Sequence, residues 1–305
     1  MIEETIPTAL AGERLDRIVA LLADVSRSHA SAVIASDGVR VDGVIAESGK
    51  QRMSAGAVIV IDENCIPQPQ RPHPDERINY DVVFEDTDIV VVDKPAGLVV
   101  HPAAGHQGGT LVNGLLARYP EIAGVGSPNR PGIVHRLDQG TSGLLVVARS
   151  ALAFQRLTEM LAGHEVQRTY RSLVWGRPSD VEFTIDAPIA RDPQDPLRMA
   201  IVSSGKEART HVTVLEQFDD PDMAFLECEL ETGRTHQIRV HLRAVGHPVV
   251  GDPVYGGARS GVDVKRPFLH AYRLSFEHPT KGERITFQSE LPEDLSKFLA
   301  HLRDN

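Results

Sequence analysis

The chain has 305 residues, of which 41% are hydrophobic and 24% charged, a balance typical of a globular protein with room for two domains. Its formal net charge of −10 argues against a uniformly basic surface, and its apolar runs are too short to span a membrane. The acidic, polar first 14 residues contain no signal-peptide core, and Cys65 and Cys228 have neither metal-binding nor redox spacing. We therefore expect a cytoplasmic protein with two inert thiols and no membrane association.

Residues 13–66 are expected to form a small module. Apolar side chains recur at helical spacing in 15–22, and a second short helix is expected from Ser28 until Gly38 ends it. Short strands are predicted at 39–41 and 58–61. This order of elements, with the segments Arg14-Leu15-Asp16 and Gly38-Val39-Arg40-Val41-Asp42-Gly43, resembles the αL RNA-binding module first described in a small-subunit ribosomal protein.

Residues 67–76 are interpreted as a linker. Four prolines occur within the eight residues from Pro67 to Pro74, which favours a stiff, extended spacer over packed structure. A proline-rich ligand motif is the alternative. A larger domain, 77–305, follows.

Strands and helices do not alternate strictly in this larger domain. This favours an α+β fold with a mixed, largely antiparallel central sheet flanked by helices. The predicted strands are 82–84, 89–92, 144–148, 169–174, 211–216, 225–230, 268–276 and 284–287, and the predicted helices are 111–119, 151–161, 235–245 and 293–301.

The run His135-Arg136-Leu137-Asp138-Gln139-Gly140-Thr141-Ser142-Gly143-Leu144-Leu145 is the most informative segment. It places one carboxylate, Asp138, at a turn that leads into an apolar strand, where a side chain can be held rigidly in a cleft. An isolated His-Arg-Asp cluster is typical of a surface ion pair. The complete string, however, closely resembles the signature of the RluA family of pseudouridine synthases, which implies the pseudouridine synthase fold and a catalytic role for Asp138.

Isomerising uridine requires breaking the N1–glycosidic bond, rotating the uracil and joining the sugar to C5. One carboxylate suffices, either as a nucleophile on the sugar or as the base that removes its C2′ proton, and the sequence leaves both roles open. The reaction consumes no water, electrons or phosphate, so we expect no cofactor and no metal. The sequence contains neither a glycine-rich phosphate loop nor a paired-histidine zinc motif.

A second motif, 231–239, resembles the family segment whose arginine pairs with the catalytic aspartate. The resemblance assigns this role to Arg234, which would fix the orientation of the Asp138 carboxylate. Along the predicted helix, His236, Arg239 and Arg243 share a face suited to RNA phosphates, with a solvated basic face as the alternative. Residues 234–273 carry seven basic and two acidic side chains, so a local positive surface is expected.

Five further site residues are expected by resemblance. Tyr170 would line the uracil pocket and help to remove the C5 proton, although a single tyrosine on a strand is more often core. Arg136 would fill the space that the extruded base leaves in the RNA stack. Lys206, otherwise a surface lysine, belongs to another family segment, and His135 and Thr141 complete the substrate-binding set. The family segments at 93–102, 251–256 and 270–274 are interpreted as scaffold.

The sequence thus predicts a monomeric RNA pseudouridine synthase for structured RNA, most like the branch that modifies 23S rRNA, with 23S rRNA or a ribosomal precursor as partner. Gln139, where that branch often has Lys or Arg, leaves the exact uridine open. A tRNA pseudouridine synthase and a non-catalytic RNA-binding or ribosome assembly factor are the alternatives. A glycoside hydrolase would need a second positioned carboxylate, which these motifs lack.

Overall fold

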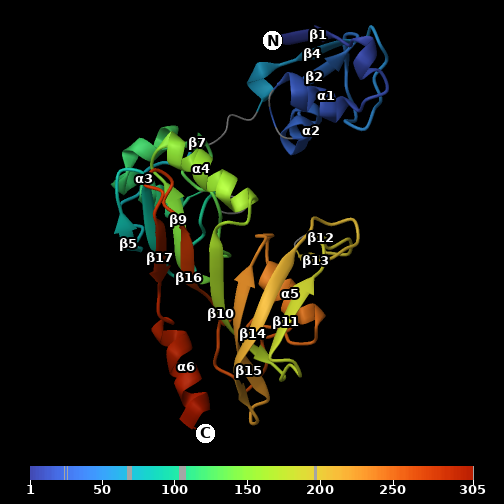
Figure 1. Cartoon of the computed structure of the whole chain (residues 1–305). Helices are drawn as coiled ribbons and strands as arrows, with labels where there is room; N and C mark the ends of the chain where they lie inside the picture. Colours follow the sequence, from blue (N-terminus) through green and yellow to red (C-terminus); the bar gives the residue numbers. More distant parts are fainter. Residues whose placement is uncertain (24, 26, 67–70, 103–107, 196–197, 305) are drawn as a thin grey trace. The chain divides into compact units, whose positions relative to one another are not determined.

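A computed structural model describes residues 1–23, 25, 27–66, 71–102, 108–195 and 198–304 (Figure 1). The chain divides into two compact units, Met1–Gln70 and Arg71–Asn305. Residues 67–70 of the predicted linker lie outside the described residues. The rest of that segment is held on the second unit, because Asn113 Nδ2 donates to the carbonyl of His73 at 2.7 Å and the amide of Asp75 donates to the carbonyl of Asn113 at 2.9 Å.

The first unit packs two helices against a small antiparallel sheet of strand order β1-β4-β2-β3. Leu15 and Ile18 of the first helix and Val33 of the second are fully buried against Ile59 and Ile61 of the sheet. Its elements are β1 (Ile2–Thr5), η1 (Thr8–Leu10), α1 (Leu15–Leu22), α2 (Arg27–Ala35), β2 (Val39–Val41), β3 (Val44–Ile45), β4 (Val58–Ile61) and η2 (Glu63–Cys65). Both predicted helices and both predicted strands are present, and the flanking strands β1 and β3 were not predicted.

The second helix ends earlier than expected. It stops at Ala35, and the chain reverses at Asp37, whose φ of 60° is left-handed, one residue before Gly38. No single described helix is long and apolar enough to cross a membrane, and α1 and α2 would meet that criterion only when taken together despite a bend of 106° between them.

The second unit is built on one large sheet, which has nine strands among the described residues. The elements are β5 (Asp81–Glu85), β6 (Ile89–Lys94), α3 (Leu111–Arg118), η3 (Pro120–Gly124), β7 (Gly126–Ser127), β8 (Arg130–Pro131), β9 (Ser142–Ala148), α4 (Ala151–Ala162), β10 (Gln167–Trp175), β11 (Glu182–Asp186), β12 (Ile189–Arg191), β13 (Met199–Ile201), β14 (Arg209–Phe218), β15 (Met223–Leu230), α5 (Gln237–Ala244), β16 (Leu269–Glu277), β17 (Arg284–Gln288) and α6 (Glu293–Asp304). The strand order is β11-β14-β15-β10-β16-β9-β6-β5, with β17 paired to β16.

The two halves of this sheet join at one short parallel contact. Every other strand pair of the sheet is antiparallel, whereas β9 and β16 are parallel and meet only at His270–Ser142 and Ala271–Gly143. Gly143 has a φ of 112°, and a Cβ there would lie 2.4 Å from the carbonyl oxygen of Ala271. A side chain at this position would push the strands apart, so glycine is required immediately after the Asp138 turn.

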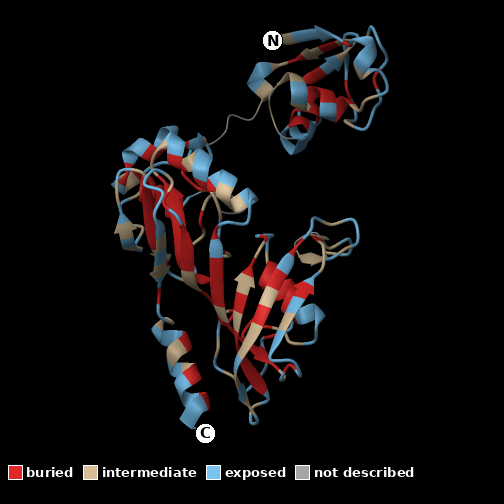
Figure 2. Cartoon of the chain, in the orientation of Figure 1, coloured by how far each residue is buried: buried red, intermediate tan, exposed pale blue. Residues whose placement is uncertain are grey.

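Helices cover both faces of the inner strands, which explains why β6 and β9 are apolar at nearly every position. On one face Val90 and Val92 pack with Leu111 and Leu115 of α3, and on the other Ile89 and Val91 pack with α4. Figure 2 shows β9 as buried along its length, and β6 is buried at every position except Asp93. The predicted α+β fold with a mixed, largely antiparallel sheet is confirmed. The short strands β11, β12 and β13 were not predicted.

Candidate active site

A cavity of about 570 Å³ opens in the second unit where the Asp138 turn, β10 and the start of α5 meet. Eight of the predicted site residues line it, namely His135, Arg136, Asp138, Thr141, Tyr170, Arg234, His236 and Arg239. The cavity therefore collects side chains that are as far apart in the sequence as His135 and Arg239. Two predicted residues, Lys206 and Arg243, are exposed and are not among the residues that line the cavity.

The turn that carries Asp138 is held by backbone hydrogen bonds. The amide of Thr141 donates to the carbonyl of Asp138 at 3.1 Å, and the amide of Gly97 donates to the carbonyl of Gln139 at 2.8 Å. The ammonium of Lys94 contacts the same turn at the carbonyl of Gln139, at 3.4 Å, and donates to the carbonyls of Pro95 and Leu98 at 2.8 and 2.9 Å. These contacts fix the position of a carboxylate whose side chain is 17% exposed.

Arg239, rather than Arg234, pairs with Asp138. Its Nη1 donates to Asp138 Oδ2 at 3.0 Å, while its Nε and Nη2 donate to the two carboxylate oxygens of Asp252 at 2.6 and 3.0 Å. Asp252 is fully buried and also accepts from the amides of Val254 and Tyr255. Burial lowers the pKa of Arg239, but the bonds and charges of Asp252 and Asp138 outweigh it and raise that pKa above its ordinary value.

The prediction that Arg234 is the partner is wrong, and the reason lies in the start of the helix. The helix was expected from residue 235, but His236 adopts a left-handed φ of 58° and α5 begins at Gln237. Arg234 therefore precedes the helix, where its Nε donates to the carbonyl of Glu207 at 2.9 Å. Arg239 falls in the first turn of α5 and faces Asp138 instead.

The pairing also overturns the prediction that Arg239 and Arg243 form a joint phosphate-binding face. Arg239 is only 6% exposed and both ends of its guanidinium are occupied, whereas Arg243 is exposed. The third member of that predicted face, His236, turns inward, with its Nδ1 2.8 Å from the hydroxyl of Tyr255 and its Nε2 4.0 Å from Asp138 Oδ2. Burial lowers the pKa of His236.

Tyr170 is buried on β10, and its ring belongs to the wall of the cavity. Burial, supported by the negative charge of Asp138 and opposed by Arg168, raises the pKa of Tyr170 to about 12. At neutral pH its hydroxyl is therefore protonated and can donate a hydrogen bond. It would act as a base only after losing that proton to another group.

Three comparisons with known proteins agree on one family. A family model described as RNA pseudouridylate synthase matches residues 88–244, and an S4 domain model matches residues 13–59. An uncharacterized RNA pseudouridine synthase of Chloroflexus aurantiacus is 49% identical over 301 residues, covering 98% of this chain and 93% of that protein. The chain belongs to the RNA pseudouridylate synthase family.

The resemblance to the RluA family is thereby confirmed, and this synthase is an isomerase with an RNA-binding S4 module. The ribosomal large subunit pseudouridine synthase D of Neisseria meningitidis serogroup B is 45% identical over 319 residues, covering 98% of this chain and 81% of that protein. The solved structure of human RNA pseudouridylate synthase domain containing 1 is 28% identical with a TM-score of 0.57, covering 76% of this chain and 98% of that one.

Two other predicted residues of the synthase make contacts beside the Asp138 turn. The amide of Val146 donates to His135 Nε2 at 3.1 Å, and burial followed by the charge of Arg168 lowers the pKa of His135 to about 3, so the ring is neutral. The His135 ring therefore attaches the segment before the Asp138 turn to β9. Arg136 is exposed, and its Nη1 lies 3.3 Å from Nε2 of His101.

Three site residues of the synthase were missed or read only as scaffold. Lys94 is fully buried, and burial lowers its pKa to about 7. Asp252, read as scaffold in segment 251–256, anchors Arg239. Arg168, which stands two residues before Tyr170, also lines the cavity. The first two lie in family segments named above, but nothing in the sequence indicates which side chains those segments turn inward.

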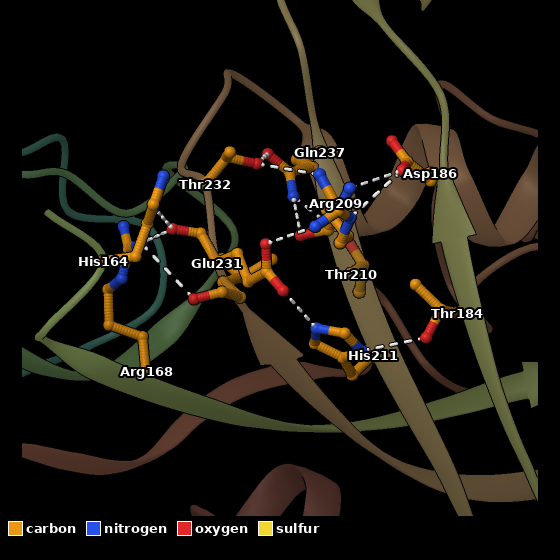
Figure 3. A network of polar contacts seen from close by, with 11 residues as sticks. His164, Arg168, Thr184, Asp186, Arg209, Thr210, His211, Glu231, Thr232 and Gln237 are labelled. Atoms are coloured by element: carbon orange, nitrogen blue, oxygen red, sulfur yellow. Dashed lines mark hydrogen bonds and ion pairs between the residues drawn. The ribbon is translucent and has the colours of Figure 1, made fainter. Parts of the chain in front are cut away.

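A network of polar side chains supports the chain between β15 and α5 (Figure 3). Gln237 Nε2 donates to the carbonyl of Arg209 at 2.9 Å, and its Oε1 accepts from the hydroxyl of Thr232 at 2.7 Å and from the amide of Arg234 at 3.0 Å. His236 provides no side-chain cap for α5, and the bonds of Gln237 tie the first residue of the helix to β14 and to the segment that precedes the helix. Among the described residues, no group of three or more His, Cys, Asp or Glu side chains could hold a metal ion.

Proposed function

We propose that Asp138 is the catalytic residue of this synthase and that its substrate is a uridine of 23S rRNA. The observation that carries the first part is the composition of the cavity. Among the described residues that line it, Asp138 is the only one with a carboxylate, and it is already fixed in place by Arg239. The reaction needs one such group, because the N1–C1′ bond breaks, a C5–C1′ bond forms, and the proton on C5 is replaced by one on N1.

The surroundings of Asp138 support this chemistry over glycoside hydrolysis. Hydrolysis normally uses two carboxyl groups on either side of the bond. The next carboxylate, Asp252, is fully buried and occupied by Arg239 and two backbone amides. Asp138 can serve as a nucleophile at C1′ or as a base at C2′, and the protonated hydroxyl of Tyr170 can hold the detached uracil by a hydrogen bond.

The cavity is cationic although the chain is acidic. Five arginines line it against the single carboxylate: Arg130, Arg136, Arg168, Arg234 and Arg239. Such a local positive field attracts RNA phosphates irrespective of the net charge of −10. The S4 module and the relatives named for the large ribosomal subunit support 23S rRNA as the substrate.

The test is to incubate the full-length protein with 23S rRNA and tRNA transcripts and to map pseudouridine by carbodiimide-dependent reverse-transcription stops. We expect stops in 23S rRNA with the wild type and none with Asp138→Asn, which is nearly isosteric but neither nucleophilic nor basic. Stops only in tRNA would assign the substrate to the alternative class. Turnover by a folded Asp138→Asn protein would exclude Asp138 as the catalyst.

A further inference from the structure

Arg168 is a buried cation without an anionic partner. It projects from β10 and is 6% exposed. Its Nη2 donates to the carbonyls of Glu231 at 3.0 Å and Leu230 at 3.4 Å, and its Nε has no hydrogen-bond partner among the described residues. No carboxylate within the described part of the chain forms an ion pair with it, in contrast to Arg239. Burying a charge without a counter-charge is unfavourable, so the folded protein maintains it at a cost.

The carboxylates of Glu231 and Asp138 have other partners. The carboxylate of Glu231 accepts from Arg209 Nη1 at 3.1 Å and bonds His211 Nε2 at 2.7 Å, so only the backbone carbonyl of Glu231 faces Arg168 (Figure 3). The carboxylate of Asp138 is paired with Arg239. The guanidinium of Arg168 is thus positioned by carbonyls, and its charge is left uncompensated.

The side chain of Arg168 lines the cavity that contains Asp138. Arg168 and Tyr170 are two residues apart on one strand, so both side chains project from the same face of β10, and both line the cavity with Asp138. Burial first, and then the positive charge of Arg234, act to lower the pKa of Arg168. Both guanidiniums therefore line a cavity whose described lining contains one carboxylate, that of Asp138, which is already paired with Arg239. The buried hydroxyl of Thr141, also a cavity residue, likewise has no partner there.

Gly233 provides the room for this guanidinium. A Cβ at Gly233 would lie 2.6 Å from Arg168 Nη1, well inside the distance that real Cβ atoms keep. Any larger residue at 233 would displace the end of the Arg168 side chain. The glycine therefore keeps the guanidinium at the wall of the cavity.

We propose that Arg168 binds a phosphate of the RNA backbone adjacent to the target uridine, so that one nucleotide is held by its phosphate at Arg168 and by its ribose at Asp138. This inference rests on the proposed function. A phosphate is favoured over a uracil oxygen because the phosphate is negatively charged as soon as the RNA binds, whereas uracil is neutral until the N1–C1′ bond breaks. A planar guanidinium also matches phosphate oxygens. Orienting the ribose in this way fixes C1′ relative to Asp138.

The experiment combines a neutral linkage in the RNA with a substitution in the protein. A hairpin containing the target uridine is prepared with a methylphosphonate at the linkage on its 5′ side and, in a second RNA, on its 3′ side. Single-turnover kcat/KM is measured for the wild type, for Arg168→Gln and for Arg171→Gln. Arg171 is the matched control, because it stands on the same strand but is already paired with Glu227 at 2.9 Å.

For the wild type and the control, one of the two neutral linkages should lower kcat/KM about tenfold or more, the size expected for a hydrogen bond to a charged group. In Arg168→Gln the same linkage should have less than a twofold effect, because the contact is already lost. The slope of log K against log salt should also flatten by about 0.7–0.9 in this variant. Equal losses in the wild type and Arg168→Gln at both linkages would overturn the proposal.

If Arg168→Gln fails to fold, Gly233→Ala decides the matter, because it displaces the guanidinium without removing a charge. It should lose the sensitivity to the same neutral linkage, and full retention of that sensitivity would overturn the proposal. The failure of the proposed function has a different signature, namely that the wild type forms no pseudouridine in the unmodified RNA.

Discussion

Replacing Arg239 by alanine should destabilise the second unit and abolish activity, whereas the same change at Arg234 should be mild. Arg239→Ala removes three hydrogen bonds, two to Asp252 and one to Asp138, from a side chain that is 7% exposed. It leaves the Asp252 carboxylate, which is 0% exposed, without a counter-charge. Removing one partner of a buried ion pair typically costs about 3–5 kcal/mol.

The backbone amides of Val254 and Tyr255 still donate to Asp252, so we expect a value near the middle of that range, about 4 kcal/mol. For a domain of this size, such a loss corresponds to a decrease in Tm of about 8–16 °C. Arg234→Ala removes one exposed bond from Nε to the carbonyl of Glu207, which is worth about 1 kcal/mol.

The assay is urea denaturation of the two single variants and the wild type, with unfolding monitored by circular dichroism. A double variant, Arg239→Met with Asp252→Leu, adds a control, because it removes the fully buried carboxylate of Asp252 together with its partner and should be more stable than Arg239→Ala. If Arg234→Ala proved more destabilising than Arg239→Ala, the assignment of Arg239 as the partner of Asp138 would be refuted.

Three further predictions concern pH and domain boundaries. The pKa of His135 is lowered to about 3 in the folded protein, against about 6.5 in the unfolded chain, so the unfolded state binds a proton first as pH falls. The free energy of unfolding should therefore fall by about 2–4 kcal/mol between pH 6.5 and pH 3. In urea titrations, His135→Gln should reduce this dependence of the free energy of unfolding on pH. In the first unit, the bond from Arg14, opposed by burial and assisted by Arg27, lowers the pKa of Asp16 to about 2. Asp16→Asn should therefore cost about 1–3 kcal/mol at pH 7, a difference that disappears between about pH 4 and pH 2 when unfolding is followed by NMR. A protein lacking residues 1–70 should remain folded and keep a higher Tm in calorimetry than one lacking residues 1–74, because the longer deletion removes the carbonyl of His73 that binds Asn113; equal Tm values would contradict this boundary.

Much of the fold could be predicted because many helices and strands of the second unit have simple patterns of apolar and capping residues. Fully apolar runs such as 89–92 indicate strands buried on both faces. Ser150, of a residue type that favours helix starts, caps α4 by accepting from the amide of Ala153. Short edge strands such as β12 and β13 have no such pattern, since their residues are largely half-exposed. Proline content also does not reveal that Pro72, within the predicted linker, is buried.

The sequence predicted most of the residues that line the candidate site but not the contacts between them. The family motifs contain Asp138, Tyr170 and Arg239, which line one cavity in the structure. They do not indicate whether Arg234 or Arg239 turns toward the Asp138 carboxylate. That choice depends on the left-handed conformation of His236, which a sequence pattern does not encode. Nor does the sequence indicate that Asp252 is buried behind Arg239, because the pair is formed by chain segments that meet only in the folded structure.

The parallel contact between β9 and β16 has a mechanical consequence for the enzyme. The Asp138 turn belongs to the half-sheet of β9, β6 and β5, whereas Tyr170 and Arg239 belong to the other half. Backbone pairing between β9 and β16 is confined to two residue pairs, so side-chain contacts also hold the two halves together. Two of these contacts are Ser142 with His270 at 3.0 Å and Asp138 with Arg239 at 3.0 Å. The ion pair that aims the carboxylate also helps to hold the halves together. Because few backbone bonds cross this contact, we expect the catalytic geometry to be lost before the unit unfolds globally.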